Sequence, residues 1–224
     1  SIKMIWLNYK MNKHLILIGK KAKKALLKKI HTKIKNKVLK KYASLIEKEK
    51  ALILKENAKD VTFALKKKLK ANLIDRLFLD LKKLNAIKRS IKKIIRLKDP
   101  VDNTLDSWKR PNGLNIQRVS IPIGVIGVIY ESRPNVTSDV ASLCFKSGNA
   151  VILKGGSEAI NTNKILIKLF RRALKENKLN ENFIQFIDSK DRKIVDYMLS
   201  KMKNYIDIII PRGGKNLVKK VQQF

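Results

Sequence analysis

The stretch Ile123–Tyr130 has the sequence IGVIGVIY, an almost unbroken apolar run. A half-buried strand alternates between apolar and polar residues, and this stretch does not. Continuous apolar runs of this length are typical of strands that are buried on both faces of a parallel sheet. The stretch therefore predicts a central strand with helices packed against both of its faces.

Outward from this strand, the chain alternates between strands and helices joined by short loops. Leu114–Val119 alternates like a preceding strand. After the central strand the pattern predicts, in order, helix Thr137–Lys146, strand Ala150–Lys154, helix Glu158–Glu176, strand Phe183–Ile187, helix Arg192–Lys201 and strand Ile206–Ile210. This alternation predicts an α/β fold with a doubly wound sheet over residues 101–224.

The first hundred residues have a different pattern, in which apolar residues recur every three or four positions and Lys fills the other face. This is typical of amphipathic helices. We expect Asn72 to cap one of them and Asp99–Pro100 to end the last, because the residue before a proline disfavours the helical region. The clean pattern begins at Met11. Residues 11–100 are therefore a predicted Lys-rich helical region, and residues 1–10 are a predicted extension without a role in the fold.

The charge of the chain is extreme. Its 224 residues include 52 Lys and Arg against 18 Asp and Glu, a formal net charge of +34. Such a charge can mark a nucleic-acid-binding protein. Here, however, 42 of the basic residues are Lys and only 10 are Arg, and Ile and Asn are also frequent, as A/T-rich codons would produce. We therefore attribute most of the charge to base composition on solvated faces, which disfavours nucleic acid as a partner.

Composition also excludes several classes of protein. A single Cys and two His leave no disulfide scaffold and no zinc-finger cluster, so we expect no metal site and predict the reducing cytoplasm as the compartment. No apolar run reaches the roughly 18 to 20 residues that span a bilayer, so we expect no membrane association. Residues 1–19 lack the small-residue cleavage site of a secretory signal.

Candidate site residues follow the predicted strands, because ligands bind at the carboxyl ends of the strands in such a sheet. The first of these turns contains Glu131, Ser132, Arg133 and Asn135. A cation and an amide at this point can hold a carboxylate or phosphate, or stabilise an oxyanion. The alternative is an ordinary turn in which Asn135 or Thr137 caps the next helix.

Two further turns combine a glycine pair with basic residues between a strand and a helix. They contain Lys154, Gly155, Gly156 and Ser157 in the first case, and Arg212, Gly213 and Gly214 in the second. Glycines let the backbone approach phosphate oxygens at a helix N-terminus. Neither turn has the spacing of a dinucleotide fingerprint, and each alone can be structural. Together they favour a site for a dinucleotide pyrophosphate.

Cys144 and the two histidines are weaker candidates. Cys144 lies among apolar residues inside a predicted helix, with no His at hydrogen-bonding spacing in the sequence. A buried Cys behaves as a small inert hydrophobe, so we expect a structural role for it. His14 and His31 belong to the Lys-rich helices, and we expect both at the surface.

Three long segments of the chain carry a family resemblance. They are residues 118–137, 143–159 and 205–215, and weaker similarity is found at residues 56–60, 73–77 and 110–113. In this order and spacing they resemble gamma-glutamyl phosphate reductase, also called glutamate-5-semialdehyde dehydrogenase, of the aldehyde dehydrogenase superfamily. The resemblance covers roughly residues 11–224.

The resemblance implies a Rossmann-like domain that binds NADPH over residues 101–224. It also implies the second step of proline biosynthesis from glutamate, in which L-glutamyl 5-phosphate is reduced to L-glutamate 5-semialdehyde and phosphate. In this family a cysteine thiolate displaces phosphate from the acyl phosphate, and the resulting thioester accepts a hydride from NADPH.

The resemblance also implies roles for residues of the three turns. Lys154 would contact the adenosine ribose or its 2′-phosphate, and Ser157 would leave room for that phosphate. Gly213 and Gly214 would cradle the pyrophosphate. Arg133 and Asn135 would lie near the substrate end.

One departure from the family is expected. The family's nucleophilic Cys comes well after the second glycine turn, beyond Phe224, and Cys144 matches a different Cys that is not the nucleophile. Three interpretations remain open: one part of an enzyme that works with a separate C-terminal half, a truncated and inactive remnant, or a basic nucleic-acid-binding protein. A homo-oligomer is a further possible assembly.

Overall fold

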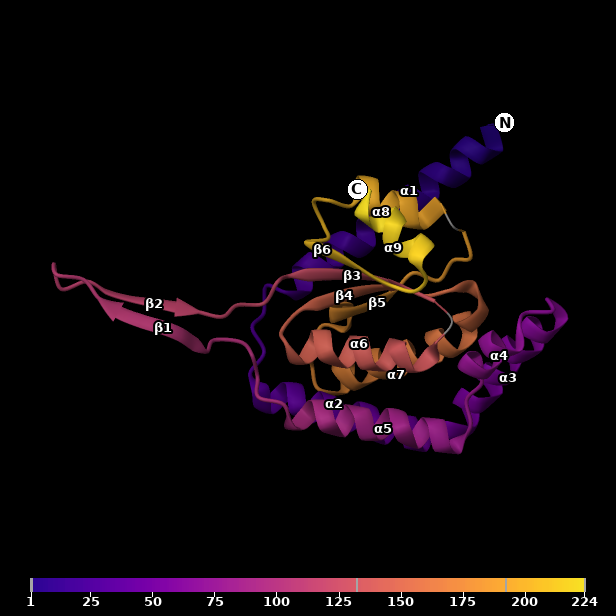
Figure 1. The fold of residues 1–224 in the computed structure, drawn as a ribbon, viewed down its shortest axis with the longest axis horizontal. Coiled ribbons are helices and arrows are strands. Elements are labelled where there is room, and N and C mark those ends of the chain that lie inside the picture. Colours follow the sequence, from indigo (N-terminus) through magenta and orange to yellow (C-terminus); the bar gives the residue numbers. More distant parts are fainter. Residues whose placement is uncertain (1, 132, 192, 224) are drawn as a thin grey trace.

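The computed structural model describes residues 2–131, 133–191 and 193–223. Its centre is a sheet of four parallel strands in the order β5-β4-β3-β6, with helices on both faces (Figure 1). The expected doubly wound α/β fold is therefore confirmed. The elements of this part are β3 (Val125–Tyr130), α6 (Pro134–Lys146), β4 (Ala150–Lys154), a 3₁₀ turn (Ser157–Ala159), α7 (Ile160–Glu176), a second 3₁₀ turn (Glu181–Phe183), β5 (Ile184–Phe186), α8 (Lys193–Lys201), β6 (Ile208–Arg212) and α9 (Lys215–Gln222).

Strand β3 is the predicted central strand. All six of its residues are buried, and Ile126 lies opposite Val151 of β4 and Ile208 of β6. The strand begins two residues later than the apolar run because Gly124 has a φ of +127°, outside the β region. Burial of both faces explains why this segment has no polar alternation.

The helices form layers on the two faces of the sheet (Figure 1). Helices α6 and α7 cover one face, and α1, α8 and α9 lie on the other. Helices α2 and α5 pack outside α6 and α7. The rings of Tyr42 from α2 and Phe170 from α7 have centroids 4.5 Å apart, and Phe145 of α6 packs against Phe170 at 5.7 Å. The helical region and the sheet therefore share one apolar core.

The first hundred residues are helical, as their periodicity predicts. The helices are α1 (Ile2–Ala25), α2 (Thr32–Lys48), α3 (Lys50–Lys66), α4 (Ala71–Leu77) and α5 (Leu81–Arg96). Two predicted details are wrong. Asn72 lies inside the first turn of α4, and Lys70 occupies the position before that helix. Helix α5 ends at Arg96, before Asp99–Pro100, and Asp80 caps its start by accepting a bond of 2.6 Å from the backbone of Lys83.

Helix α1 begins at Ile2, so the backbone of residues 2–10 continues the helix that we expected from Met11. Figure 1 shows this end of the helix pointing away from the sheet. The assignment of residues 1–10 as an extension without a role in the fold stays a prediction. Within the described ranges, no helix has both the length and the apolar character that a membrane crossing needs.

Two buried polar side chains of α3 connect the helical region to the sheet. The amide of Asn57 donates to the carbonyl of Leu77 at 2.9 Å and accepts from the backbone of Leu79 at 2.8 Å. The carboxylate of Asp60 accepts from the backbone N–H groups of Asn161 and Thr162, at 3.2 and 2.8 Å, and from both of their side chains. Asp60 thus caps the start of α7 from another helix, where a negative charge is favourable.

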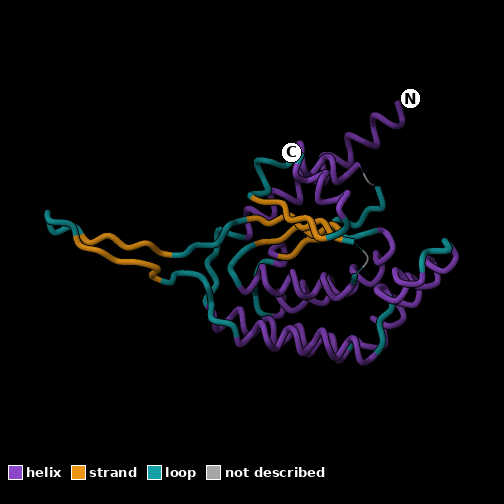
Figure 2. Tube along the Cα trace, viewed as in Figure 1, coloured by secondary structure: helices purple, strands orange, loops and turns teal. Residues whose placement is uncertain are grey.

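A hairpin that we did not predict projects from the body of the molecule (Figures 1 and 2). Strands β1 (Thr104–Lys109) and β2 (Asn115–Val119) pair antiparallel, and Gly113 closes the turn with a φ of +85°. The sequence predicted β2 alone. Every residue of β1 is exposed, so the strand has no buried face to impose an alternating pattern.

Two predicted turns are shorter than expected. Helix α6 begins at Pro134, three residues before the predicted start, because proline at the first helical position has the required φ and lacks an N–H to satisfy. Strand β6 continues through Pro211 and Arg212, which pair with β3. The second glycine turn therefore consists of Gly213 and Gly214 alone.

The cap that Asp60 provides leads to a stability prediction. Asp60→Ala removes four hydrogen bonds to a buried carboxylate and leaves the start of α7 unpaired, so we expect a loss of about 3 kcal/mol in the free energy of unfolding. Urea unfolding followed by circular dichroism measures it. Asp106→Ala, on the exposed hairpin, is the matched control and should change that free energy by less than about 0.5 kcal/mol. Equal stabilities of the two variants would contradict the assignment.

Candidate functional site

The order of the strands defines where a ligand crevice should lie. From β3 the chain moves to β4 and β5 on one side, and then returns to β6 on the other side. Doubly wound sheets bind ligands at the carboxyl ends of strands at such a reversal. A cleft of about 350 Å³ lies there, between the ends of β3 and β6 and helix α4. We call it the switch cleft; its polar lining comprises Arg76, Glu131, Arg133, Arg212, Gly213 and Gly214.

Three arginines from separate elements line the switch cleft. Arg76 comes from α4, Arg133 precedes α6, and Arg212 ends β6. The chain has only ten arginines among 52 basic residues, and within the described residues these three have no ion pair with a carboxylate. A guanidinium presents a planar fork that binds carboxylate or phosphate through two hydrogen bonds. The cleft is therefore suited to an anionic ligand.

The start of α9 in this cleft carries a carboxylate of the chain itself. Gly214 precedes α9, and its N–H donates to Oε1 of Glu131 at 3.1 Å. A Cβ atom on Gly213 would lie only 2.7 Å from Cδ of Glu131, so a larger residue would push that side chain away. Glu131 thus occupies the position that a helix N-terminus offers to an anion.

A second cleft, of about 440 Å³, adjoins the switch cleft and shares Arg76 and Arg133 with it. We call it the outer cleft; its polar lining comprises Asp75, Arg76, Lys83, Ser90, Arg133, Asn135 and Asp139. The structure thus places Asn135 in the outer cleft rather than beside the glycine turn. Asn135 lies in the first turn of α6, and the residue before that helix is Arg133. Ser132, the remaining residue of this predicted turn, lies outside the described residues.

Lys154 does not line either of these clefts. Its side chain is only 6% exposed, and its ammonium group donates to the carbonyl of Gly155 at 2.8 Å. Burial lowers the pKa of Lys154, and the nearby carboxylates of Glu158 and Asp191 oppose that effect. Lys154 therefore lies at the end of β4 as predicted, but apart from the second glycine turn.

The first glycine turn has a clear packing role. A Cβ atom on Gly155 would lie 2.5 Å from the amide nitrogen of Asn163 and 3.1 Å from the ring of Tyr130. Only glycine lets the backbone pass between these two side chains. Gly156 precedes the 3₁₀ turn with an ordinary φ of −61°, and Ser157 donates to the carboxylate of Glu158 at 3.0 Å.

Sequence and structure comparisons agree with each other. The chain is 45% identical over 197 residues to the gamma-glutamyl phosphate reductase of Persephonella marina, covering 88% of this chain and 44% of that protein. It is 50% identical over 187 residues to that of a Thermoanaerobacter species, covering 84% and 45%. The crystal structure of the Thermotoga maritima gamma-glutamyl phosphate reductase superposes with a TM-score of 0.90 at 41% identity, covering 93% of this chain and 51% of that one.

This chain is homologous to about half of a gamma-glutamyl phosphate reductase. It spans 44 to 51% of the length of the curated gamma-glutamyl phosphate reductases that it matches. A propionaldehyde dehydrogenase from Rhodopseudomonas palustris has a TM-score of 0.68 at 16% identity, which shows a shared fold alone. No family model matches the chain.

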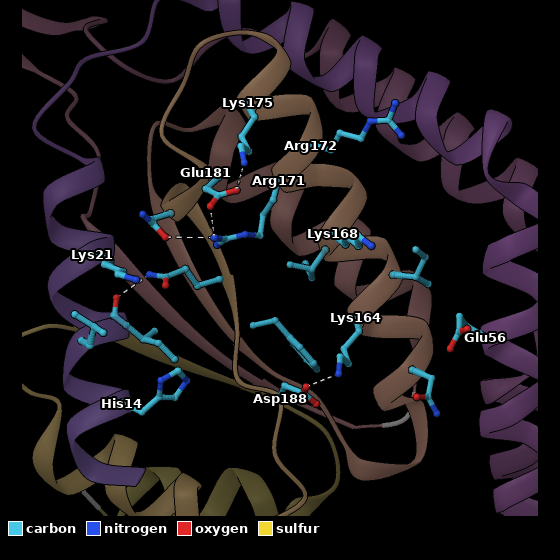
Figure 3. Close-up of a pocket in the computed structure, with 18 of the residues that line it drawn as sticks. His14, Lys21, Glu56, Lys164, Lys168, Arg171, Arg172, Lys175, Glu181 and Asp188 are labelled. Atoms are coloured by element: carbon cyan, nitrogen blue, oxygen red, sulfur yellow. Dashed lines mark hydrogen bonds and ion pairs between the residues drawn. The ribbon is translucent and has the colours of Figure 1, made fainter. Parts of the chain in front are cut away.

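Of the three clefts described, the largest is not lined by any residue that we predicted for the site. It has a volume of about 1030 Å³ and lies between α1, α3, α7 and the outer edge of β5 (Figure 3). Several of its cations are held by carboxylates: Lys164 pairs with Asp188 at 2.5 Å, and Arg171 pairs with Glu181 at 3.0 Å. Among the described residues, the predicted site residues at the ends of β3 and β6 and at the start of α6 line the two clefts at the strand ends instead, whereas residues 154–157 line neither of those clefts.

Cys144 is buried, as the sequence predicts. It is 7% exposed, and burial raises the pKa of its thiol from 9.0 to about 12. His14 and His31 are exposed, also as predicted, and His14 lines the largest cleft. The only thiol of this reductase homologue is therefore protonated at neutral pH and shielded from ligands.

Thiol alkylation tests this description of Cys144. The higher pKa lowers the thiolate fraction at neutral pH about a thousandfold, so iodoacetamide should label the native chain at least a thousandfold more slowly than the chain in urea. Mass spectrometry follows the reaction. A native rate within tenfold of the unfolded rate would show that the thiol is accessible and ionised.

Proposed function

We propose that this chain supplies the cofactor-binding part of an NADPH-dependent reductase that converts L-glutamyl 5-phosphate to L-glutamate 5-semialdehyde and phosphate. The observation that carries the proposal is the switch cleft. In a chain homologous to half of a gamma-glutamyl phosphate reductase, arginines and a glycine turn converge at the strand reversal, the position where doubly wound sheets bind dinucleotides.

The residues of the switch cleft fit a pyrophosphate. Gly213 and Gly214 leave the backbone uncovered at the start of α9, and the N–H of Gly214 already binds an oxygen anion, that of Glu131. We propose that a phosphate group takes this position when Glu131 turns away, with Arg212 beside it. NADPH supplies the hydride when it is bound. Lys154, Gly155, Gly156 and Ser157 are proposed for its adenosine end, which carries the 2′-phosphate.

The nucleophile of the proposed reaction is expected from outside these 224 residues. Cys144 is the only thiol of the chain, and a buried thiol with a pKa of about 12 cannot attack an acyl phosphate at neutral pH. We propose that a segment corresponding to the remaining half of the reductase supplies the thiolate. The cytoplasm and a homo-oligomer stay predictions.

The position of Glu131 leads to a binding prediction. Because its carboxylate competes with a phosphate for the N–H of Gly214, Glu131→Gln should strengthen NADPH binding about fivefold, which corresponds to about 1 kcal/mol. A fluorescence titration of NADPH at constant ionic strength measures the dissociation constant. Glu181→Gln, which removes a carboxylate of the largest cleft, is the control and should leave it unchanged. Weaker binding by Glu131→Gln would count against the proposed pyrophosphate position.

A second prediction concerns turnover. The isolated chain should bind NADPH and yet leave it unoxidised when L-glutamyl 5-phosphate is added, because its thiol is buried and protonated. The loss of NADPH absorbance follows the reaction. Steady unaided oxidation would disprove the external nucleophile. If turnover appears when a separately produced second half is added, that result would support the interpretation of the chain as half of a working enzyme. It would count against an inactive remnant.

A further inference from the structure

The outer cleft has the charges that an α-amino acid requires. It lies where α4, α5 and the start of α6 meet, beside the switch cleft. Its volume of about 440 Å³ falls in the range of small-molecule sites, roughly 300 to 1,000 Å³. Cationic and anionic side chains both line it. Only those charges that have no partner within the chain are free to bind a ligand.

Two cations of the outer cleft are uncommitted. Among the described residues, Arg76 and Arg133 have neither an ion pair with a carboxylate nor a side-chain hydrogen bond. Lys83 is different, because its ammonium donates to the carbonyls of Asp75 and Phe78, at 2.7 and 3.0 Å, and pairs with the Asp75 carboxylate at 3.6 Å. A carboxylate that enters the cleft therefore meets two available guanidiniums.

One anion of the outer cleft lacks a partner. Oδ1 of Asp139 is buried, and within the described part of the chain no group donates a hydrogen bond to it. A buried carboxylate oxygen without a partner is costly, so it calls for a cation or donor. Asp75 does not share this property, because its side chain is 82% exposed and pairs with Lys83.

The geometry of α6 brings the anion and one cation to the same wall. Arg133 precedes the helix, and Asn135 and Asp139 are four residues apart, so they lie on one helical face. The side chains between them turn inward: Thr137 bonds Tyr130 at 2.6 Å, and Ser138 bonds Tyr42 at 2.7 Å. The carboxylate of Asp139 thus lies about one helical turn below Asn135, on the wall that Arg133 begins.

We propose that the outer cleft binds the α-amino-acid end of the glutamyl substrate, with Arg76 and Arg133 on the α-carboxylate and Asp139 on the α-ammonium. This assignment rests on the proposed function, which supplies the substrate. Because both arginines also line the switch cleft, a substrate held in this way extends its reactive end towards the cofactor position. On this assignment, the residues that select an amino acid all come before the proposed catalytic thiol in the sequence.

The rarity of Arg in this Lys-rich chain supports the assignment of Arg76 and Arg133 to the α-carboxylate. Forty-two of its 52 basic residues are Lys, which serves equally well on a solvated face. Arg76 and Arg133 are two of ten exceptions, and they meet at one cleft. A carboxylate bound through two parallel hydrogen bonds requires the planar fork that Lys lacks.

Ligand discrimination by the unmodified chain is the first test. L-glutamate carries the α-carboxylate and α-ammonium of the substrate, glutarate lacks the ammonium, and 4-aminobutyrate lacks the α-carboxylate. Ligand-observed NMR titrations at one salt concentration should show L-glutamate binding at least about tenfold more tightly than either analogue, as expected for one charged hydrogen-bonded contact. Equal binding of all three compounds would overturn the proposal.

Variants then assign the two contacts. Asp139→Asn should abolish the preference for L-glutamate over glutarate, and Arg133→Lys should reduce the preference over 4-aminobutyrate at least about fivefold. Asp106→Asn, on the exposed strand β1 away from both clefts, is the control and should retain both preferences. Asp139→Asn removes an unpartnered buried charge, so the variant should melt no lower than the unmodified chain. A folded Asp139→Asn variant that still prefers L-glutamate would overturn the role of Asp139.

NADPH titrations of the same samples separate the two proposals. If NADPH binds and L-glutamate is not preferred over its analogues, the amino-acid site is wrong and the proposed function stands. If L-glutamate is preferred and NADPH does not bind, the outer cleft is supported as an amino-acid site and the reductase function fails. If NADPH does not bind and L-glutamate is not preferred over its analogues, both proposals are overturned.

Discussion

The buried amide of Asn57 fixes where the helical region meets the sheet. It donates to the carbonyl of Leu77, accepts from the N–H of Leu79 and donates to the hydroxyl of Thr162, so it ties the end of α4 to the start of α7. Arg76 immediately precedes Leu77. Its position over the strand ends therefore depends on an amide one helix away, which explains how a residue of the helical region comes to line both clefts.

Asp60, three residues after Asn57, extends this connection. Its carboxylate is buried and accepts four hydrogen bonds from Asn161 and Thr162. The buried polar groups of α3 and those at the start of α7 therefore satisfy one another. A fully satisfied buried network stabilises one arrangement, whereas a sliding interface would leave several groups unpaired. The clefts are thus built between elements that are fixed relative to one another. Such rigidity is what the orientation of a small ligand requires.

The sequence predicted those features that local pattern determines. β3 was predicted because both of its faces are buried, and the positions of Glu131, Arg133 and Gly213 at a cleft were predicted because these residues follow strands, whereas their roles stay predictions. Arg76 and Asp139 were missed because they lie inside helices, where spacing does not show that two helix faces enclose a cleft. The exposed strand β1 was missed because it has no buried face. Lys154 follows a strand, as predicted, yet the sequence could not show that its ammonium is buried against Gly155.

The net charge of +34 therefore says little about the site. Charges on exposed Lys side chains are screened over about 8 to 10 Å in salt, so they attract anions without selecting a position for one. Selection depends on groups that are fixed at the clefts: the unpaired guanidiniums, the Oδ1 of Asp139, which has no partner among the described residues, and the N–H of Gly214, which is bonded to Glu131. The carboxylates of Glu131 and Asp139 are informative, because a site that only attracted anions would not need a carboxylate. Glu131 occupies an anion position, and Asp139 is the proposed partner of a ligand's ammonium group. On the proposed assignment, the arginines and Asp139 together select a ligand with charges of both signs, which uniform positive charge cannot do.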